Sequence, residues 1–306
     1  MSGRRQQKSV LIIGAGYLGK AVASEAAAAG WRVVGARRNA PDGSSPVPGF
    51  SAWLSMDVLK IDDLRTAIDS FAHSFDAVVY CVSAGTPSVD AYRDAYQHGL
   101  ANVISILPAT ARLVFVSSTG VYPEDDGRWV DEFHQIDEES VAPTQRAMLA
   151  GEQFVNERSN SLVLRFSGIY GPGRTRMLNV ARDAQDPMTV REIAYTNRIH
   201  VEDGARAVVH CLELQNPART YCVTDSDPAP QHEIIVWLRQ QLGLKPLSVV
   251  FTGPDGMPLA HKDLPETNKR VRNGLLASTG FSWKFPGYRD GYGSLVTSND
   301  RGASHV

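Results

Sequence analysis

Three glycines near the start of the chain have the spacing that a pyrophosphate-binding turn requires. Residues 14–19 read GAGYLG, after the apolar run 9–13 and before an alanine-rich stretch that extends to about residue 29. In such a strand–turn–helix unit the first glycine makes the tight turn, and the second lets the backbone approach the phosphates. The third lets the helix pack closely on the strand, and the N–H groups of the first helical turn hold the phosphates. The expected cofactor contacts of this turn are Gly14, Gly16, Tyr17, Leu18 and Gly19. The sequence therefore predicts a bound dinucleotide, the alternative being a glycine turn without a ligand.

Two arginines indicate which dinucleotide to expect. The second apolar segment, 31–36, ends at Arg37 and Arg38, and the first acidic residue after it is Asp42, in a Pro/Gly/Ser-rich loop. NAD-binding versions of this unit usually carry Asp or Glu about twenty residues past the glycines, where it accepts from the ribose hydroxyls. A carboxylate would repel a 2′-phosphate, whereas a guanidinium binds one bidentately. We therefore expect NADP(H), with NAD(H) less favoured; a solvated basic pair is the alternative.

Strand-like and helix-like segments alternate over the first half of the chain. Expected strands are 9–13, 31–36, a short one before Asp57, 76–82, 112–117 and 161–166; expected helices are 18–29, one that starts by Asp63, 89–107 and 143–158. This order predicts an α/β fold, a doubly wound parallel sheet with helices on both faces. Ligands of such sheets bind beyond the carboxyl ends of the strands. Further cofactor contacts are therefore expected at strand ends: Asp57, Val58, Val82, Ser83, Ala84 and Ser117.

Composition is that of an enzyme-sized α/β protein. The 306 residues are 43% hydrophobic and carry a formal net charge of −2, so overall charge suggests neither a nucleic acid nor an acidic membrane surface as partner. No apolar run approaches the ~20 residues of a membrane helix, and the polar start of the chain does not read as a signal segment. Three widely spaced cysteines favour reduced thiols in the cytoplasm, with no metal site.

Several later segments carry a resemblance to a known family. They are VSSTGVY (116–122), LRFSGIYGPG (164–173), NRIHVED (197–203) and YCVTD (221–225). With the glycine turn they resemble, in order, the extended short-chain dehydrogenase/reductases, which include the nucleotide-sugar epimerases and dehydratases. The GAGYLG turn and the late segments 269–271 and 280–281 are similar to an atypical, YeeZ-type branch. The resemblance implies a Rossmann domain over 1–170, to which later segments return, and a smaller substrate-binding lobe mainly in 171–306.

The chain departs from this family at its catalytic dyad. Typical members carry Tyr-x-x-x-Lys at the start of a helix, where the Tyr is the general acid or base and the Lys lowers its pKa. Aligning on residues 151–154 puts Thr144 at the Tyr position and Met148 at the Lys position. No lysine occurs between Lys60 and Lys245, so a gap does not restore the pair. A Thr hydroxyl ionises far too weakly to replace a phenol, and Met is neutral. We expect the usual proton relay to be absent.

The remaining candidates are few, and each has a structural alternative. By the resemblance, Ser118 is the catalytic hydroxyl that binds the substrate oxygen; otherwise it satisfies a backbone group at a strand end. Tyr122 is either a surrogate acid or a packing tyrosine. Arg146, on the same helix turn as Thr144, is either an anion-binding or a solvated arginine. His200 borders the implied substrate lobe, where a structural role competes with substrate binding.

Two functions from different classes remain open. The first is an NADPH-dependent oxidoreductase that reduces a carbonyl, imine or enone, because the cofactor carries the difficult chemistry. The second is a non-catalytic NADP(H)-binding sensor or partner protein; a sugar-nucleotide-type epimerase or dehydratase is the third choice. Helices 89–107 and 143–158 could pair in a homodimer, and the expected seam is Ile104, Leu107, Met148 and Phe154.

Overall fold

A seven-stranded sheet forms the centre of the computed structural model, which describes all residues except 1–6, 42–46, 70–74, 191–192, 252–267 and 303–306. The strand order is β12-β7-β5-β4-β1-β2-β3. Their bounds are Ser9–Ile13 (β1), Arg32–Arg37 (β2), Ala52–Ser55 (β3), Ala77–Tyr80 (β4), Arg112–Ser118 (β5), Ser161–Phe166 (β7) and Thr220–Val223 (β12). From β3 to β7 every neighbouring pair is parallel. The expected α/β fold with a doubly wound parallel sheet is confirmed.

The central strands are apolar throughout because both of their faces are covered. All five residues of β1 and all four of β4 are buried, and Val10, Leu11 and Ile12 have no exposed surface. Parallel strands buried on both faces read as continuous apolar runs, unlike the alternating pattern of a half-exposed strand. Register pairs Ile13 with Ala36 of β2 and with Tyr80 of β4. The carboxyl ends of these three strands therefore lie side by side.

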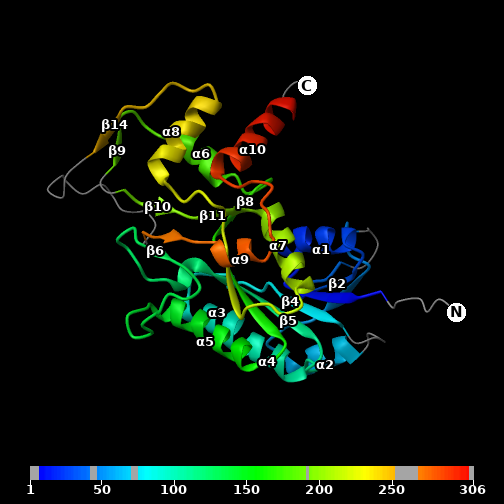
Figure 1. The fold of residues 1–306 in the computed structure, drawn as a ribbon. Coiled ribbons are helices and arrows are strands. Elements are labelled where there is room, and N and C mark those ends of the chain that lie inside the picture. Colours follow the sequence, from blue (N-terminus) through cyan, green and yellow to red (C-terminus); the bar gives the residue numbers. More distant parts are fainter. Residues whose placement is uncertain (1–6, 42–46, 70–74, 191–192, 252–267, 303–306) are drawn as a thin grey trace. The chain divides into compact units, whose positions relative to one another are not determined.

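Helices cover both faces of this sheet (Figure 1). On one face lie α1 (Tyr17–Ala28) and α7 (Val201–Glu213), and on the other α2 (Ile61–Asp69), α3 (Val89–Arg93), α4 (Gly99–Ile106) and α5 (Pro143–Glu157). The expected helix 89–107 is interrupted by a π-helical turn, Asp94–His98, between α3 and α4. There the Tyr80 hydroxyl donates to the Ala95 carbonyl at 2.6 Å. Because this contact joins two different elements, the hydrophobic periodicity of the helix does not reveal the interruption.

Only part of the expected dimer seam (Ile104, Leu107, Met148 and Phe154) is exposed to solvent. Leu107 and Met148 are 7% and 5% exposed because they pack within their own chain. Phe154 is 37% exposed, and Ile104 is half-buried. A second copy could therefore bury Phe154 and part of Ile104, and the homodimer stays a prediction.

The chain divides into two compact units, and each is made of separate segments. Unit 1 contains 1–122, 136–166 and 204–221, and unit 2 contains 123–135, 167–203 and 222–306. The family resemblance implied a boundary at residue 170. In the structure, the later segment 204–221 belongs to unit 1, which contains the sheet, and the earlier segment 123–135 belongs to unit 2. The chain thus leaves unit 1 directly after Tyr122.

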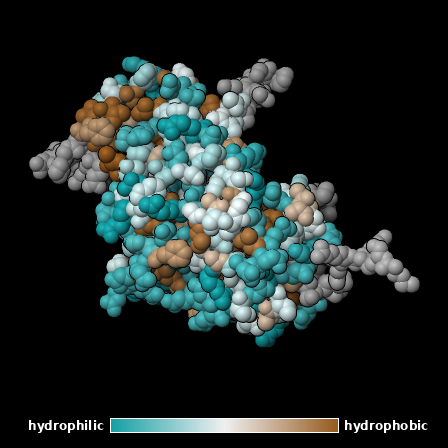
Figure 2. Space-filling model, viewed as in Figure 1, coloured by the Kyte–Doolittle hydropathy of each residue, from teal (hydrophilic) through white to brown (hydrophobic). Residues whose placement is uncertain are grey.

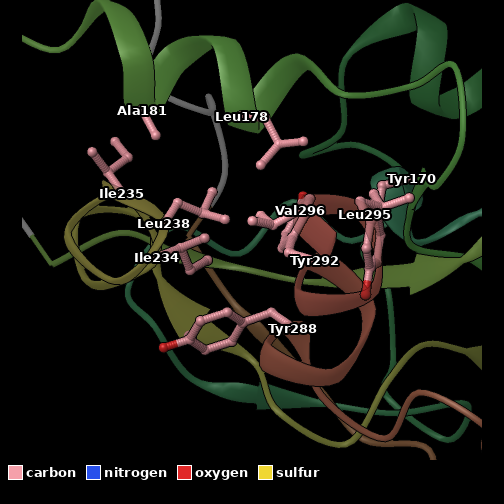
Figure 3. Close-up of a cluster of buried hydrophobic side chains, with 11 residues drawn as sticks. Tyr170, Leu178, Ala181, Ile234, Ile235, Leu238, Tyr288, Tyr292, Leu295 and Val296 are labelled. Carbon is pink, nitrogen blue, oxygen red and sulfur yellow. The ribbon is translucent and has the colours of Figure 1, made fainter. Parts of the chain in front are cut away.

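The described residues of unit 2 form short paired strands and four helices. The strand pairs are β8 (Gly168–Tyr170) with β11 (Arg198–His200), β9 (Met188–Val190) with β14 (Val249–Phe251), β10 (Tyr195–Thr196) with β13 (Ala229–Pro230), and β6 (Trp129–Val130) with β15 (Arg270–Val271). The helices are α6 (Arg176–Asp183), α8 (Gln231–Gln241), α9 (Gly274–Ser278) and α10 (Tyr288–Gly302). Figure 3 shows the buried cluster that α6, α8 and α10 share, with Leu178, Leu238 and Tyr292 among its members.

Apolar side chains also reach the surface of unit 2. Figure 2 shows them gathered over β9 and β14, where Val250 is 44% and Phe251 61% exposed. None of the helices in the described part of the chain has the length and apolar character needed to cross a bilayer.

Candidate functional site

The glycine turn joins β1 to α1 and packs against the end of β4. Gly14 has φ +83°, and its N–H donates to the Ala36 carbonyl at 3.0 Å. A Cβ on Gly14 would lie 2.7 Å from both the carbonyl carbon of Cys81 and the nitrogen of Val82. A Cβ on Gly19 would lie 3.1 Å from the Gly14 oxygen. Only glycine satisfies the turn at Gly14, and Gly19 allows the close approach of α1 to the strand.

Gly16 is the open position of the same turn. The nearest heavy atom to a Cβ built there, apart from its chain neighbours, is the Gly14 oxygen at 3.8 Å, and Gly16 is exposed. Helix α1 then starts at Tyr17 with no side-chain cap and no acidic residue in its first turn; Leu18 follows and is buried. An uncapped helix N-terminus presents backbone N–H donors and the positive end of the helix dipole. The turn therefore fits the pyrophosphate of a dinucleotide.

Two exposed arginines lie at the end of β2, next to this turn. The Gly14 N–H bonds to Ala36, the residue immediately before Arg37, so the turn and the arginines share one strand end. The Arg37 guanidinium carbon lies 5.4 Å from the centre of the Trp53 ring on β3. Arg38 follows, and its carbonyl accepts from the Ser55 hydroxyl at 2.8 Å. Two exposed arginines thus lie at the strand end where the second strand of a dinucleotide fold meets the adenosine ribose.

The other strand-end residues lie at the carboxyl ends of β3 and β4. Asp57 Oδ1 accepts from the Leu59 N–H at 3.1 Å, so Asp57 supports the turn that leads into α2. Val58 is half-buried, and its carbonyl accepts from Asn102 at 3.0 Å. After β4, residues 82–84 leave the sheet with Ser83 exposed and with Val82 and Ala84 half-buried. Of these, Val82 is the residue that the structure brings directly against the glycine turn.

A buried polar network, which sequence reasoning missed, connects the end of β5 to α5 and β7. Glu152 is 3% exposed, and its carboxylate accepts from the Ser117 hydroxyl at 2.6 Å and from Arg165 Nη2 at 2.7 Å. Arg165 Nη1 donates to the Tyr122 hydroxyl at 2.8 Å, and the Tyr122 side chain has no exposed surface. Two features of the sequence could have indicated this network: Arg165 stands within an otherwise apolar strand, and Glu152 lies on the buried face of a helix.

This network constrains two of the expected site residues. The Ser117 hydroxyl is engaged by Glu152, so its role toward a cofactor stays a prediction. Tyr122 is buried beneath the Arg165 guanidinium, whose carbon lies 4.9 Å from the ring centre. That burial favours the packing alternative for Tyr122 over a surrogate acid.

Ser118 ends β5 and is half-buried. Its Oγ accepts from the Gly120 N–H at 3.0 Å and so caps the short helical turn Thr119–Val121. The hydroxyl proton of a serine that accepts in this way can still be donated, because the oxygen carries two lone pairs and one O–H. Ser118 therefore combines the structural role considered from the sequence with the capacity to donate to a substrate oxygen.

The two dyad positions lie on the first turns of α5. Thr144 is half-buried, whereas Met148 is 5% exposed. The Met148 methyl lies 3.8 Å from a Cβ built on Gly120, and Gln145 donates to the Gly120 carbonyl at 2.8 Å. Arg146 is exposed, and its Nε donates to the Glu138 carbonyl at 3.2 Å. The helix is thus anchored beside Ser118, but the side chain at the lysine position is apolar.

His200 lies in unit 2, in a buried aromatic environment. It is 1% exposed, and its ring centre is 5.3 Å from that of Tyr170 and 4.0 Å from that of Phe285. Nδ1 accepts from the Glu202 N–H at 3.3 Å. Burial lowers the pKa of His200, which favours the neutral form of the ring. Within the residues that the structure describes, no group of three or more His, Cys, Asp or Glu side chains could hold a metal ion.

Comparisons with known proteins agree with this geometry. The model of the NAD dependent epimerase/dehydratase family matches residues 10–223. Protein YeeZ of Escherichia coli (strain K12) is 25% identical over 253 residues, which cover 78% of this chain and 85% of YeeZ. A Methylobacillus flagellatus structure named for the same family superposes with a TM-score of 0.74 at 30% identity, over 96% of this chain and 99% of that one.

A more distant structure shares the fold. The UDP-glucose 4-epimerase of Thermus thermophilus, solved as a complex with NAD, has a TM-score of 0.67 at 19% identity, over 96% of this chain and 99% of the epimerase. With the glycine turn and the strand ends described above, the family match over most of the chain settles the assignment: the protein belongs to the NAD dependent epimerase/dehydratase family.

Proposed function

We propose that the protein is an NADPH-dependent oxidoreductase that reduces a small-molecule carbonyl, imine or enone. The observation that carries the proposal is the open Gly16 backbone beside two exposed arginines at the end of β2. The first fits a pyrophosphate, and the second supplies charge-assisted donors for a 2′-phosphate. The family match and the NAD complex of the Thermus enzyme support a nicotinamide cofactor.

The chain's own residues would bind and orient the reactants. The bound cofactor supplies the hydride. Ser118 holds the reacting oxygen or nitrogen by donating its hydroxyl proton, while Gly120 fixes the Ser118 oxygen from behind at 3.0 Å. Thr144 and Met148 provide no group that can act as the family's Tyr–Lys pair. Arg146, which is exposed, is available for an anionic group on the substrate.

Two alternative functions each have one observation in their favour. A sugar-nucleotide epimerase or dehydratase is supported by the family match, but both reactions normally begin with oxidation assisted by the missing tyrosine. A sensor or partner protein would bind NADP(H) without turnover, and the apolar Met148 at the lysine position is the observation in its favour. The free thiols Cys81, Cys211 and Cys222 support a reducing, cytoplasmic setting for any of these functions.

The experiment that tests the proposal is NADPH consumption by the purified protein. A panel of aldehydes, α-diketones, cyclic imines and enones is offered, and oxidation is followed by the loss of reduced-nicotinamide absorbance. Calorimetry with NADPH runs in parallel. Turnover of any class in the panel supports the oxidoreductase. Tight NADPH binding without turnover of any of them favours the sensor, and no NADPH binding refutes both.

A further inference from the structure

A cavity of about 200 Å³ lies at the amino-terminal edge of the sheet, within unit 1. Five of its lining residues begin a strand or directly precede one. Lys8 precedes β1, Asp76 precedes β4 and Arg112 begins β5, while Trp31 and Asn160 precede β2 and β7. These strands are neighbours, and the parallel β1, five residues long at ~3.3 Å each, separates this edge from the glycine turn. The cavity is therefore distinct from the cofactor site.

Hydrogen bonds fix the walls of this cavity. Trp31 is 6% exposed, and its Nε1 donates to Oε1 of Glu213, the last residue of α7, at 3.3 Å. Arg112 Nη1 donates to two backbone carbonyls at the carboxyl end of α7, at 2.9 and 2.6 Å. Asp76 Oδ2 accepts from the Ser9 N–H at 2.7 Å. These side chains are held in place without a ligand, which lowers the ordering cost of binding one.

Charged side chains of both signs line the cavity: Lys8, Arg112, Asp76 and Glu213. Among the residues that the structure describes, none of these four forms an ion pair. Asp76 and Glu213 each use one carboxylate oxygen in the bonds above, so the second oxygen of each can accept from a ligand. Lys8 Nζ lies 5.2 Å from the centre of the Trp31 ring and carries three donors. The cavity thus offers both acceptors and a cationic donor.

A ligand that carries both charges close together matches this lining. At ~30 Å³ per water, the volume corresponds to roughly six or seven water-sized groups, the size of a small amino acid. An anion without a positive charge would meet two carboxylates, and a cation without a negative charge would meet Lys8 and Arg112. In an α-amino acid one carbon bears both the ammonium and the carboxylate, so each charge can face its opposite within so small a space.

We propose that this cavity binds a small α-amino acid as a zwitterion. The ligand ammonium donates to Asp76 and Glu213, and the ligand carboxylate accepts from Lys8. Trp31 forms an apolar wall beside the α-carbon. The site goes beyond the oxidoreductase function proposed above and does not depend on it, because the amino acid and the dinucleotide occupy opposite edges of the sheet.

The first test follows the Trp31 indole N–H in nitrogen-15 NMR spectra of the protein. Its signal is assigned among the five tryptophans by its loss in Trp31→Phe. Glycine, L-alanine, L-serine and L-threonine are titrated to millimolar concentrations. At least one should shift this signal saturably, because the indole donates to Glu213. Propionate and ethylamine, which each carry one of the two charges of alanine, should bind much more weakly. No saturable shift with any of the four amino acids, or equal binding of the singly charged analogues, would overturn the proposal.

The second test removes one ligand contact at a time. Lys8→Met removes the donor to the ligand carboxylate, and Glu213→Gln removes a charge but keeps an oxygen that accepts from Trp31. Each should weaken amino acid binding about tenfold, the lower end for a charge-assisted hydrogen bond. Lys60→Met and Glu157→Gln are the matched controls, because both side chains are exposed on the same unit and neither lines the cavity. Parental affinity in both Lys8→Met and Glu213→Gln would refute the site.

Calorimetry with NADPH separates this site from the cofactor site. Lys8→Met should bind NADPH as the parent does, since Lys8 lies before β1 and the glycine turn follows it. A parallel loss of NADPH and amino acid binding in Lys8→Met would contradict two separate sites. Amino acid binding by a parent that binds no NADPH would support this inference and refute the proposed function, and the reverse result would refute this inference alone.

Discussion

Replacing Glu152 by glutamine should destabilise unit 1 substantially. The Glu152 carboxylate accepts from the Ser117 hydroxyl at 2.6 Å and from Arg165 through Nη2 at 2.7 Å and Nε at 3.1 Å. The substitution leaves the Arg165 side chain, which is 10% exposed, without its counter-charge. Breaking a buried ion pair by removing one partner costs about 3–5 kcal/mol. We expect a loss of that order in the free energy of unfolding.

Urea unfolding followed by circular dichroism measures this loss. Asp62→Asn is the matched control, because Asp62 pairs with Arg65 at 3.8 Å on an exposed helix surface, and its removal should leave the midpoint nearly unchanged. The double variant Glu152→Leu/Arg165→Met should recover much of the loss, since it leaves no unpaired buried charge. A loss in Glu152→Gln below about 1 kcal/mol, the range of exposed ion pairs, would refute the reasoning.

Three further predictions follow from the same structure. Ser118→Ala should lower turnover about 100- to 1,000-fold with little change in NADPH affinity, and Thr144→Ala should do much less; steady-state kinetics showing the reverse order would contradict the assigned roles. Burial raises the pKa of Asp225 to about 8, so the folded protein keeps a proton that the unfolded chain releases near pH 4. Stability should therefore fall as pH rises from about 4 to 8, by at most about 1.4 kcal/mol per pH unit, and Asp225→Asn should flatten this fall in urea unfolding. Light scattering at micromolar concentration should give the mass of a homodimer, and a monomer mass would refute that prediction.

The sequence was sufficient for the elements whose signals are local. The apolar strands, the glycine turn and the alternation of strand and helix follow from short-range patterns, and they define the sheet and its carboxyl edge. The absence of a lysine near Met148 is equally plain in the sequence, and the structure adds that Met148 packs beside Gly120.

Features that depend on distant contacts could not be predicted. The π-helical turn at Asp94–His98 interrupts a helix whose sequence shows no break, and Tyr80, from a different element, contacts it. The burial of Tyr122 depends on Arg165, and the low exposure of Lys269 depends on a segment more than a hundred residues earlier. A sequence identifies such polar residues but not their partners, because the partners are set by tertiary packing.

The most direct test of the central claim is a calorimetric titration of the parent protein and Arg37→Ala with NADPH and with NADH. The parent should bind NADPH more tightly than NADH. Loss of one charge-assisted phosphate contact should weaken NADPH binding in Arg37→Ala by about 1.5–3 kcal/mol and leave NADH binding nearly unchanged. Equal affinities of the parent for the two cofactors, or an equal loss for both in the variant, would contradict the account.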